Sequence, residues 1–283
     1  MTSTLVRQHP PLAGPAPRVD LGARARDWSE IQERMLVPLY EAVYERLEVG
    51  PATRLLGLGC GSGLALLVAV SRGAAVTGVE TSSPERLALA RERLLPKPWG
   101  ARAGGDARLL DGPPEADAGA APYGLVTAFE PIGCLAGDTE RLTETLRAVV
   151  PPARRGTPVV VAGWGPPERC ATASVLRAAG KLADPPHGTG EWRPARRDDL
   201  EEATARAGLR PDGSGRVACP FGYADLTSAR RGLLSTGLFD PAVAATGQER
   251  VDKELTEALH PYRRPDGTVW MPNVFRYLIA RVP

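Results

Sequence analysis

Residues 54–63 read Arg-Leu-Leu-Gly-Leu-Gly-Cys-Gly-Ser-Gly, and this stretch decides the fold. Its apolar start gives way to glycines at alternate positions from Gly59 to Gly63, and an unbroken apolar segment over 64–70 follows. This order predicts a buried strand, a tight turn and a buried helix. Alternate glycines leave bare backbone that a ligand can approach, and the free N–H groups of the following helix point to the same place. The stretch therefore predicts a turn that holds a nucleoside-bearing cofactor.

The spacing of these glycines argues against a dinucleotide. A dinucleotide-binding turn has glycines at its first, third and sixth places. Counted from Gly57 the sixth place is Ser62, and counted from Gly59 it is Leu64. The sequence also lacks a Tyr-x-x-x-Lys dyad. A nicotinamide-dependent dehydrogenase is therefore disfavoured.

A second predicted strand adds an acid to the turn. Residues 75–79 form a short apolar run that ends in Glu80, which lies 21 residues beyond Gly59. In a nucleotide-binding unit of strand, helix and strand, an acid at this position accepts hydrogen bonds from ribose hydroxyls. Ser83 and Pro84 then open a helix. The alternative is that Glu80 is only a solvated strand end.

Strands and helices alternate along the first 165 residues. This alternation predicts a parallel sheet with helices on both faces, a Rossmann-like doubly wound α/β fold whose ligands bind beyond the carboxyl ends of the strands. We expect about seven strands, mostly parallel, with the last strand, 274–280, antiparallel. The other predicted strands are 54–58, 75–79, one near 100–104, 123–129, 158–162 and 214–219. The predicted helices are 25–48, 64–72, 84–94, one that starts at Asp138, 198–208, 224–238 and 241–260.

The chain is expected to form one domain with a lid. Residues 1–24 contain several prolines and no apolar signal core, so we predict a flexible N-terminal arm. Residues 25–283 are predicted to form a single domain. Within it, residues 25–48 and 221–264 are additional to the minimal sheet, and we expect them to cap the substrate site. Lids of this kind exclude water and select substrates.

Composition limits the partners. The chain has 283 residues, of which 43% are apolar, and a formal net charge of +2, so it can bury a core and has no field that attracts nucleic acid. No run of about 18 apolar residues predicts a membrane span. The four cysteines form no Cys-x-x-Cys pair, so we expect no metal site and a reducing cytoplasm. The expected partner is a small molecule, and a homodimer is left open.

The Gly-x-Gly-x-Gly turn resembles the first motif of class I methyltransferases that use S-adenosylmethionine. The resemblance covers residues 50–165 by motifs and the remainder by the order of elements. The segment 261–267 is similar to one in actinobacterial methyltransferases that tailor natural products. The resemblance implies methyl transfer from S-adenosylmethionine to carbon, nitrogen or oxygen of a small acceptor. An aromatic secondary metabolite is expected, and indole carbon 3 of a tryptophan cyclodipeptide is one candidate.

The same resemblance implies a set of cofactor-binding residues. Glu80 would bind the ribose, Asp106 the adenine amine, and Phe129 would lie near the transferred methyl group. Trp28, on the first predicted helix, would cover the cofactor. The predicted cofactor-binding residues are Trp28, Gly59, Cys60, Gly61, Gly63, Glu80, Thr81, Asp106, Ala107 and Phe129.

Two positions depart from the family pattern. The family often has an acid just inside the first strand, where this chain has Gly57, and Phe-Asp at the start of the fourth strand, where it has Tyr123-Gly124. The first acid usually helps to anchor the amino-acid part of the cofactor. An alternative function follows from its loss: a methyltransferase-like protein that binds the cofactor but performs cyclisation or sensing without methyl transfer.

Methyl transfer is a displacement in which the enzyme holds nucleophile and methyl carbon in line, about 3 Å apart. A base helps only where the acceptor must lose a proton. The candidate catalytic residues are Glu130, His187 and Tyr223, with His260 as a further candidate. A surface carboxylate and a solvated loop histidine are the respective alternatives for Glu130 and His187.

Aromatic side chains offer candidate walls for the acceptor. Trp164, Phe221 and Phe275 present flat apolar surfaces that suit an aromatic acceptor. The alternative for each is a position in the ordinary core.

Overall fold

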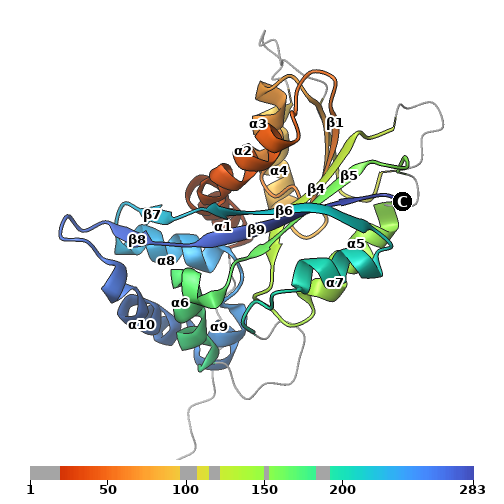
Figure 1. Ribbon diagram of the computed structural model, residues 1–283. Helices are drawn as coiled ribbons and strands as arrows, with labels where there is room; N and C mark the ends of the chain where they lie inside the picture. Colours follow the sequence, from red (N-terminus) through yellow and green to blue (C-terminus); the bar gives the residue numbers. More distant parts are fainter. Residues whose placement is uncertain (1–19, 96–106, 115–121, 150–152, 183–191) are drawn as a thin grey trace, which may run out of the picture.

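The computed structural model describes residues 20–95, 107–114, 122–149, 153–182 and 192–283. Its centre is a seven-stranded sheet with strand order β3-β2-β1-β4-β5-β9-β6 (Figure 1). The strands are β1 Arg54–Leu58, β2 Ala75–Val79, β3 Ala107–Leu110, β4 Leu125–Ile132, β5 Pro158–Trp164, β6 Arg210–Ala218 and β9 Val274–Arg281.

The pairing of the strands confirms the predicted fold. β1 pairs in parallel with both β2 and β4, β2 pairs in parallel with β3, and β4 with β5. β9 is antiparallel to its neighbours β5 and β6. The strand order reverses beside β1, and doubly wound sheets bind ligands at such a switch point.

Helices cover both faces of the sheet, and each face has its own apolar cluster. One cluster joins the sheet to α2 and α3, and the other joins it to α5 and α7. Figure 1 shows these two pairs on opposite sides of the sheet. The helices of these layers are α2 Val37–Arg46, α3 Leu64–Ser71, α4 Pro84–Leu94, α5 Asp138–Val149 and α7 Asp199–Arg206.

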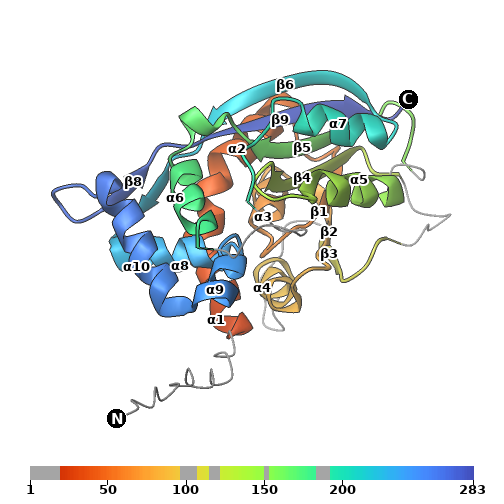
Figure 2. The ribbon, with the colours of Figure 1, turned by 90° about the horizontal axis from the view of Figure 1, so that it is seen from below.

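A second group of helices lies beside the sheet (Figure 2). It consists of α1 Leu21–Asp27, α6 Ala171–Gly180, α8 Leu226–Ser235, α9 Asp240–Thr246 and α10 Gln248–Leu259, near the hairpin of β7 Phe221–Tyr223 and β8 Val269–Met271. Ion pairs link α1 to this group: Arg24 pairs with Asp240 at 2.9 Å, and Asp27 pairs with Arg231. The N-terminal segment and the late helices therefore form one layer.

The structure corrects several predicted boundaries. α1 begins at Leu21, where Asp20 accepts a hydrogen bond from the Ala23 N–H, so the predicted arm 1–24 ends sooner. Residues 1–19 lie outside the described residues. The third strand starts at Ala107 rather than near 100–104, a stretch that also lies outside them.

The helices differ from the prediction in three ways. The predicted helix 25–48 is interrupted by η1, a π-helical turn over Trp28–Gln32, and η2, a 3₁₀ turn over Glu33–Leu36. The predicted helix 241–260 is two helices, α9 and α10, because Gly247 has a φ of 84° and interrupts the helical path. Helix α6, over Ala171–Gly180, was not predicted. Within the described residues, no helix is long and apolar enough to cross a membrane.

Candidate functional site

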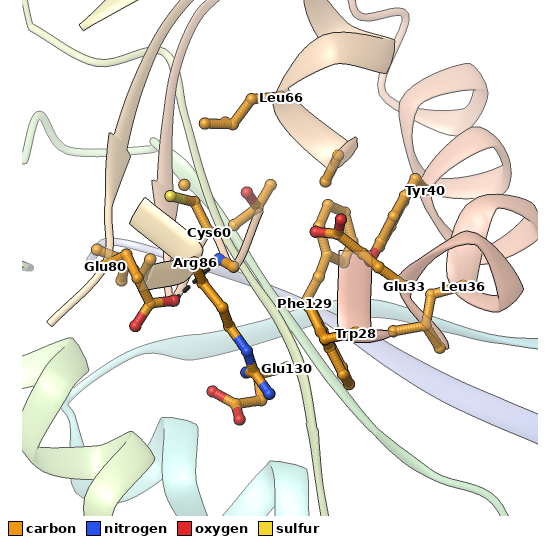
Figure 3. Close-up of a pocket in the computed structure, with 16 residues that line it drawn as sticks. Trp28, Glu33, Leu36, Tyr40, Cys60, Leu66, Glu80, Arg86, Phe129 and Glu130 are labelled. Atoms are coloured by element: carbon orange, nitrogen blue, oxygen red, sulfur yellow. Dashed lines mark hydrogen bonds between the residues drawn. The ribbon is translucent and has the colours of Figure 1, made fainter. Parts of the chain in front are cut away.

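A narrow cavity lies over the glycine turn, at the carboxyl ends of β1, β2 and β4 (Figure 3). Its volume is about 30 Å³, room for about two water molecules. Two groups of residues face each other across it, with Arg86 of α4 between them. We call them the sheet wall, which consists of Gly59, Cys60, Gly61, Glu80, Phe129 and Glu130, and the helix wall, which consists of Trp28, Glu33, Leu36 and Tyr40.

The glycine turn depends on backbone conformations that other residues rarely adopt. Gly59 and Gly61 each have a φ of 57°, and Gly63 has a φ of 82°. A Cβ on Gly61 would lie 3.1 Å from the Glu33 carboxylate, so the turn and the helix wall are in contact. A Cβ on Gly63 would instead lie 2.9 Å from Leu94 of α4. Gly63 is therefore a packing position and does not line the cavity.

Glu80 joins the end of β2 to the glycine turn. Its side chain is only 3% exposed, so the alternative of a solvated strand end is wrong. Its Oε2 accepts a hydrogen bond from the Gly61 N–H at 2.9 Å, and its Oε1 accepts from the N–H groups of Ser82 and Ser83. A carboxylate offers about four lone pairs, so Oε2 keeps capacity for a further donor from the cavity.

Glu33 brings a second carboxylate to the turn. It is 2% exposed and pairs through Oε2 with Arg93 at 2.9 Å and with the Ser62 hydroxyl. Its Oε1 makes only a long contact of 3.4 Å with the Leu64 N–H. Burial raises the pKa of Glu33, and hydrogen bonds from Ser62 and Arg93 oppose this rise.

Trp28 closes the cavity from the helix wall. The Arg86 guanidinium lies 4.2 Å from the centre of its ring, a cation–π contact. The Arg86 side chain also donates to the Ser235 carbonyl of α8 at 3.0 Å. The Trp28 Nε1 is buried and has no acceptor among the described residues. A buried N–H without a partner costs free energy, and a bound ligand with an acceptor there would remove that cost.

The ionisable groups give the cavity a negative balance. Glu33, Glu80 and Glu130 line it against the single guanidinium of Arg86. Figure 3 shows Arg86 extending beside Glu130. Desolvation by the surrounding protein raises the pKa of Glu130, and the positive charge of Arg86 opposes this rise. The Glu130 side chain is exposed at the mouth of the cavity, so solvent limits the rise. The arrangement favours a ligand with positive charge.

Apolar groups fill the depth of the cavity. The Phe129 ring lies 5.0 Å from that of Tyr40 and 5.6 Å from that of Tyr44, so it joins the sheet to α2. Burial raises the pKa of the Cys60 thiol to about 12. Cys60 therefore remains a neutral thiol and is not an activated nucleophile.

A second, smaller cavity lies near the ends of β4 and β5. Trp164, Trp192, Cys134 and Cys170 are among its lining residues. Arg193, which also lines it, is held by carboxylates of α5 and α7. This cavity offers aromatic and apolar walls.

The structure brings many of the predicted site residues together. Trp28, Gly59, Cys60, Gly61, Glu80, Phe129 and Glu130 line the first cavity, and Trp164 lines the second. Thr81 is exposed, and Ala107 begins β3; neither lines a cavity. Asp106 and His187 lie outside the described residues.

Three predicted aromatic residues lie in the core instead. Phe221 and Phe275 are 2% and 0% exposed and pack with Trp164. The Tyr223 hydroxyl is buried, donates to Gln32 Oε1 at 2.9 Å, and has a raised pKa because of burial. A base in that position would be hard to ionise, and Tyr223 is not among the lining residues of either cavity. His260 is exposed at the end of α10.

The prediction from sequence missed Glu33 and Arg86. Both read as ordinary polar positions on helices, and neither belongs to a motif. The sequence holds no signal for Glu33, because the polar residues Gln32 and Arg34 flank it and it reads as one more solvated position of the helix.

No family model and no curated protein matches the chain. Solved structures resemble it in fold. A protein of Bacillus halodurans C-125 described as a candidate methyltransferase superposes with a TM-score of 0.51 at 13% identity, over 86% of this chain and 98% of that one. YcgJ of Bacillus subtilis gives a TM-score of 0.51 at 14% identity, over 86% of this chain and 97% of that one.

A third similar structure contains a ligand. The mycolic acid cyclopropane synthase CmaA1, complexed with SAH and CTAB, superposes with a TM-score of 0.50 at 13% identity, over 88% of this chain and 83% of that one. The fold is the Rossmann-like methyltransferase fold. In this fold the cavity over the glycine turn lies where the doubly wound sheet binds its ligand.

Proposed function

We propose that the protein binds S-adenosylmethionine over the glycine turn and transfers its methyl group to a small molecule. The observation that carries the proposal is the turn itself. Gly59 and Gly61 approach the cavity with bare backbone, and the Gly61 N–H is held by Glu80 from the next strand. The fold, with its switch point at this turn, supports the same function.

The residues of the cavity fit this cofactor. Oε2 of Glu80 can accept from a ribose hydroxyl. The excess of carboxylates suits the positive charge of a sulfonium. The volume of about 30 Å³ is too small for a nucleoside. The cavity therefore has to widen when the cofactor binds.

The bound cofactor would supply an activated methyl group on a positively charged sulfur. The chain's own task is then to hold the acceptor in line and to exclude water. Phe129 and Tyr40 provide apolar surface for this purpose. Glu130 lies at the mouth of the cavity, and its raised pKa suits a general base for an acceptor that must lose a proton.

The acceptor is proposed to be an aromatic secondary metabolite. The rings of Trp164 and Trp192 at the second cavity support an aromatic acceptor, although this cavity, of about 10 Å³, would have to open to admit one. Indole carbon 3 of a tryptophan cyclodipeptide remains one candidate. All four cysteines are buried and free, which supports a reducing cytoplasm as the setting. Whether two copies of the chain associate stays open, as in the prediction from sequence.

Titration calorimetry with S-adenosylmethionine tests the proposal. We expect the wild-type protein to bind with a Kd below about 1 mM, and Glu80→Gln to weaken binding about tenfold, a loss of about 1.4 kcal/mol. Glu92→Gln, at an exposed position of α4, is the matched control and should leave the Kd unchanged. No heat and no thermal shift for the wild type would contradict the proposal.

The alternative is cofactor binding with cyclisation or sensing and no transfer. Gly57, in place of an acid, favours it. Incubation with cofactor labelled on the methyl group and a panel of aromatic acceptors separates the two functions. Label in the acceptor supports transfer, whereas bound cofactor with no label moved supports the alternative.

A further inference from the structure

The first strand of this chain offers no acid to the cofactor, because Gly57 has no side chain and packs against Leu66 of α3. A Cβ on Gly57 would lie 2.8 Å from Cδ2 of Leu66, because α3 packs directly on β1 there. The Leu66 side chain would have to shift to admit a carboxylate at this position. Any negative group that holds the amino-acid end of a cofactor therefore has to come from another element.

Glu33 of the helix wall supplies such a group. Its Oε1 lies 3.1 Å from the point where a Cβ of Gly61 would stand, directly over the turn. Arg93 and Ser62 hold the other oxygen, Oε2, and so fix the orientation of the carboxylate. Oε1 has only the long contact with Leu64 and keeps capacity for an ammonium donor.

Trp28 supplies a donor at the same place. Its Nε1 lies 3.3 Å from the same point over Gly61 and has no acceptor among the residues that the structure describes. The pair thus presents one acceptor and one donor over a single glycine. An α-amino acid zwitterion carries the complementary groups, an ammonium and a carboxylate, on one carbon.

The π-helical turn η1 brings this pair together. The Glu33 N–H donates to the Trp28 carbonyl, which is the five-residue hydrogen bond of a π-helix. On an α-helix, residues five apart point about 140° away from each other around the axis. Single π-helical turns occur mostly at functional sites. Here the extra residue in the turn places Trp28 and Glu33 on the same cavity.

We infer that Glu33 and Trp28 bind the amino-acid end of the cofactor, with Glu33 Oε1 accepting from the ammonium and Trp28 Nε1 donating to the carboxylate. The inference rests on the proposed function and deepens it. It assigns to the helix wall the role that no acid of the first strand fills in this chain. The helix wall then recognises the amino acid, and the sheet wall recognises the nucleoside.

Calorimetry with three related ligands tests the inference. S-adenosylhomocysteine carries both groups, decarboxylated S-adenosylhomocysteine keeps only the ammonium, and 5′-methylthioadenosine has neither. Glu33→Gln should raise the Kd of the first two about tenfold and change that of 5′-methylthioadenosine by less than about twofold. Trp28→Phe keeps the ring and removes the N–H, and should weaken only S-adenosylhomocysteine, by about fivefold.

Glu30→Gln is the matched control, because Glu30 is an exposed acid of the same turn. It should leave all three affinities unchanged. If Glu33→Gln weakens all three ligands equally, or none, the inference is overturned, since its role is then structural or absent. If the wild type binds 5′-methylthioadenosine and S-adenosylhomocysteine with equal affinity, the inference also fails, but the nucleoside site of the proposed function stands. If the wild type binds no ligand, the proposed function fails, and the inference fails with it.

Discussion

The two walls of the cavity are built in different ways. The sheet wall consists of strand ends and a glycine turn whose backbone is fixed by the parallel ladder and by the bond from Gly61 to Glu80. The helix wall comes from one helical segment that is held to the sheet by side chains, chiefly the Glu33–Arg93 ion pair and the rings around Phe129. We therefore expect the sheet wall to keep its shape when a ligand binds and the helix wall to adjust its side chains to the ligand.

The largest predicted effect comes from removing the contact that the walls share. Phe129→Ala should lower the free energy of unfolding by about 3–5 kcal/mol, because Phe129 is 5% exposed and packs on both Tyr40 and Tyr44. Urea unfolding measures this. Leu67→Ala, at a position 37% exposed on α3, is the control and should cost far less. Equal costs would show that the walls are not joined through Phe129.

A smaller effect tests how tightly the glycine turn, which carries part of the sheet wall, packs against α4. Gly63 and Gly208 have nearly equal φ angles of 82° and 79°, but a Cβ would meet Ala90 at 3.1 Å in the first case and nothing within 4 Å in the second. Gly208→Ala should cost about 1–2 kcal/mol for its backbone conformation. Gly63→Ala should cost about 1–3 kcal/mol more, from overpacking against α4. If both variants lose the same stability on thermal unfolding, the contact with Ala90 does not constrain the turn, and the sheet wall is not rigid at this point.

The smallest effect concerns the helix wall and depends on pH. Burial raises the pKa of Glu33 in the folded protein above its ordinary value of 4.5, so the folded state binds a proton more readily than the unfolded state does. The free energy of unfolding should therefore fall as pH rises from 4.5 through the raised pKa, and level off above it. Glu33→Gln should lack this fall. Urea unfolding of both proteins across that range measures the difference, and a flat or rising difference would contradict the expected sign.

The same contrast explains what the sequence could predict. The residues that make the sheet wall are close together along the chain, and each has a local reason: alternate glycines for the turn and an acid after the second strand. The parallel sheet with helices on both faces also follows from the alternation of strands and helices. Sequence reasoning therefore predicted the fold, and it named Gly59, Gly61 and Glu80, which the structure places in the cavity.

The helix wall could not be predicted in this way. The apolar residues Ile31, Met35 and Leu39 recur at helical spacing, and this predicts a continuous helix. Periodicity does not encode the extra residue of a π-helical turn, so the convergence of Trp28 and Glu33 was not visible. Likewise, an aromatic side chain such as Phe275 suits a core and a substrate wall equally well, and only the packing decides between them.

The position of β9 has a consequence for how the chain reaches this fold. β9 lies between β5 and β6 and is the only bridge between them. During synthesis, β5 leaves the ribosome long before Arg281 does. Until then the apolar strand of Val159, Val160 and Val161 has an open edge, which is a site for unwanted pairing with other chains. The newly made protein thus depends on β9 to cover this edge, and its most vulnerable interval lies between the synthesis of β5 and that of β9.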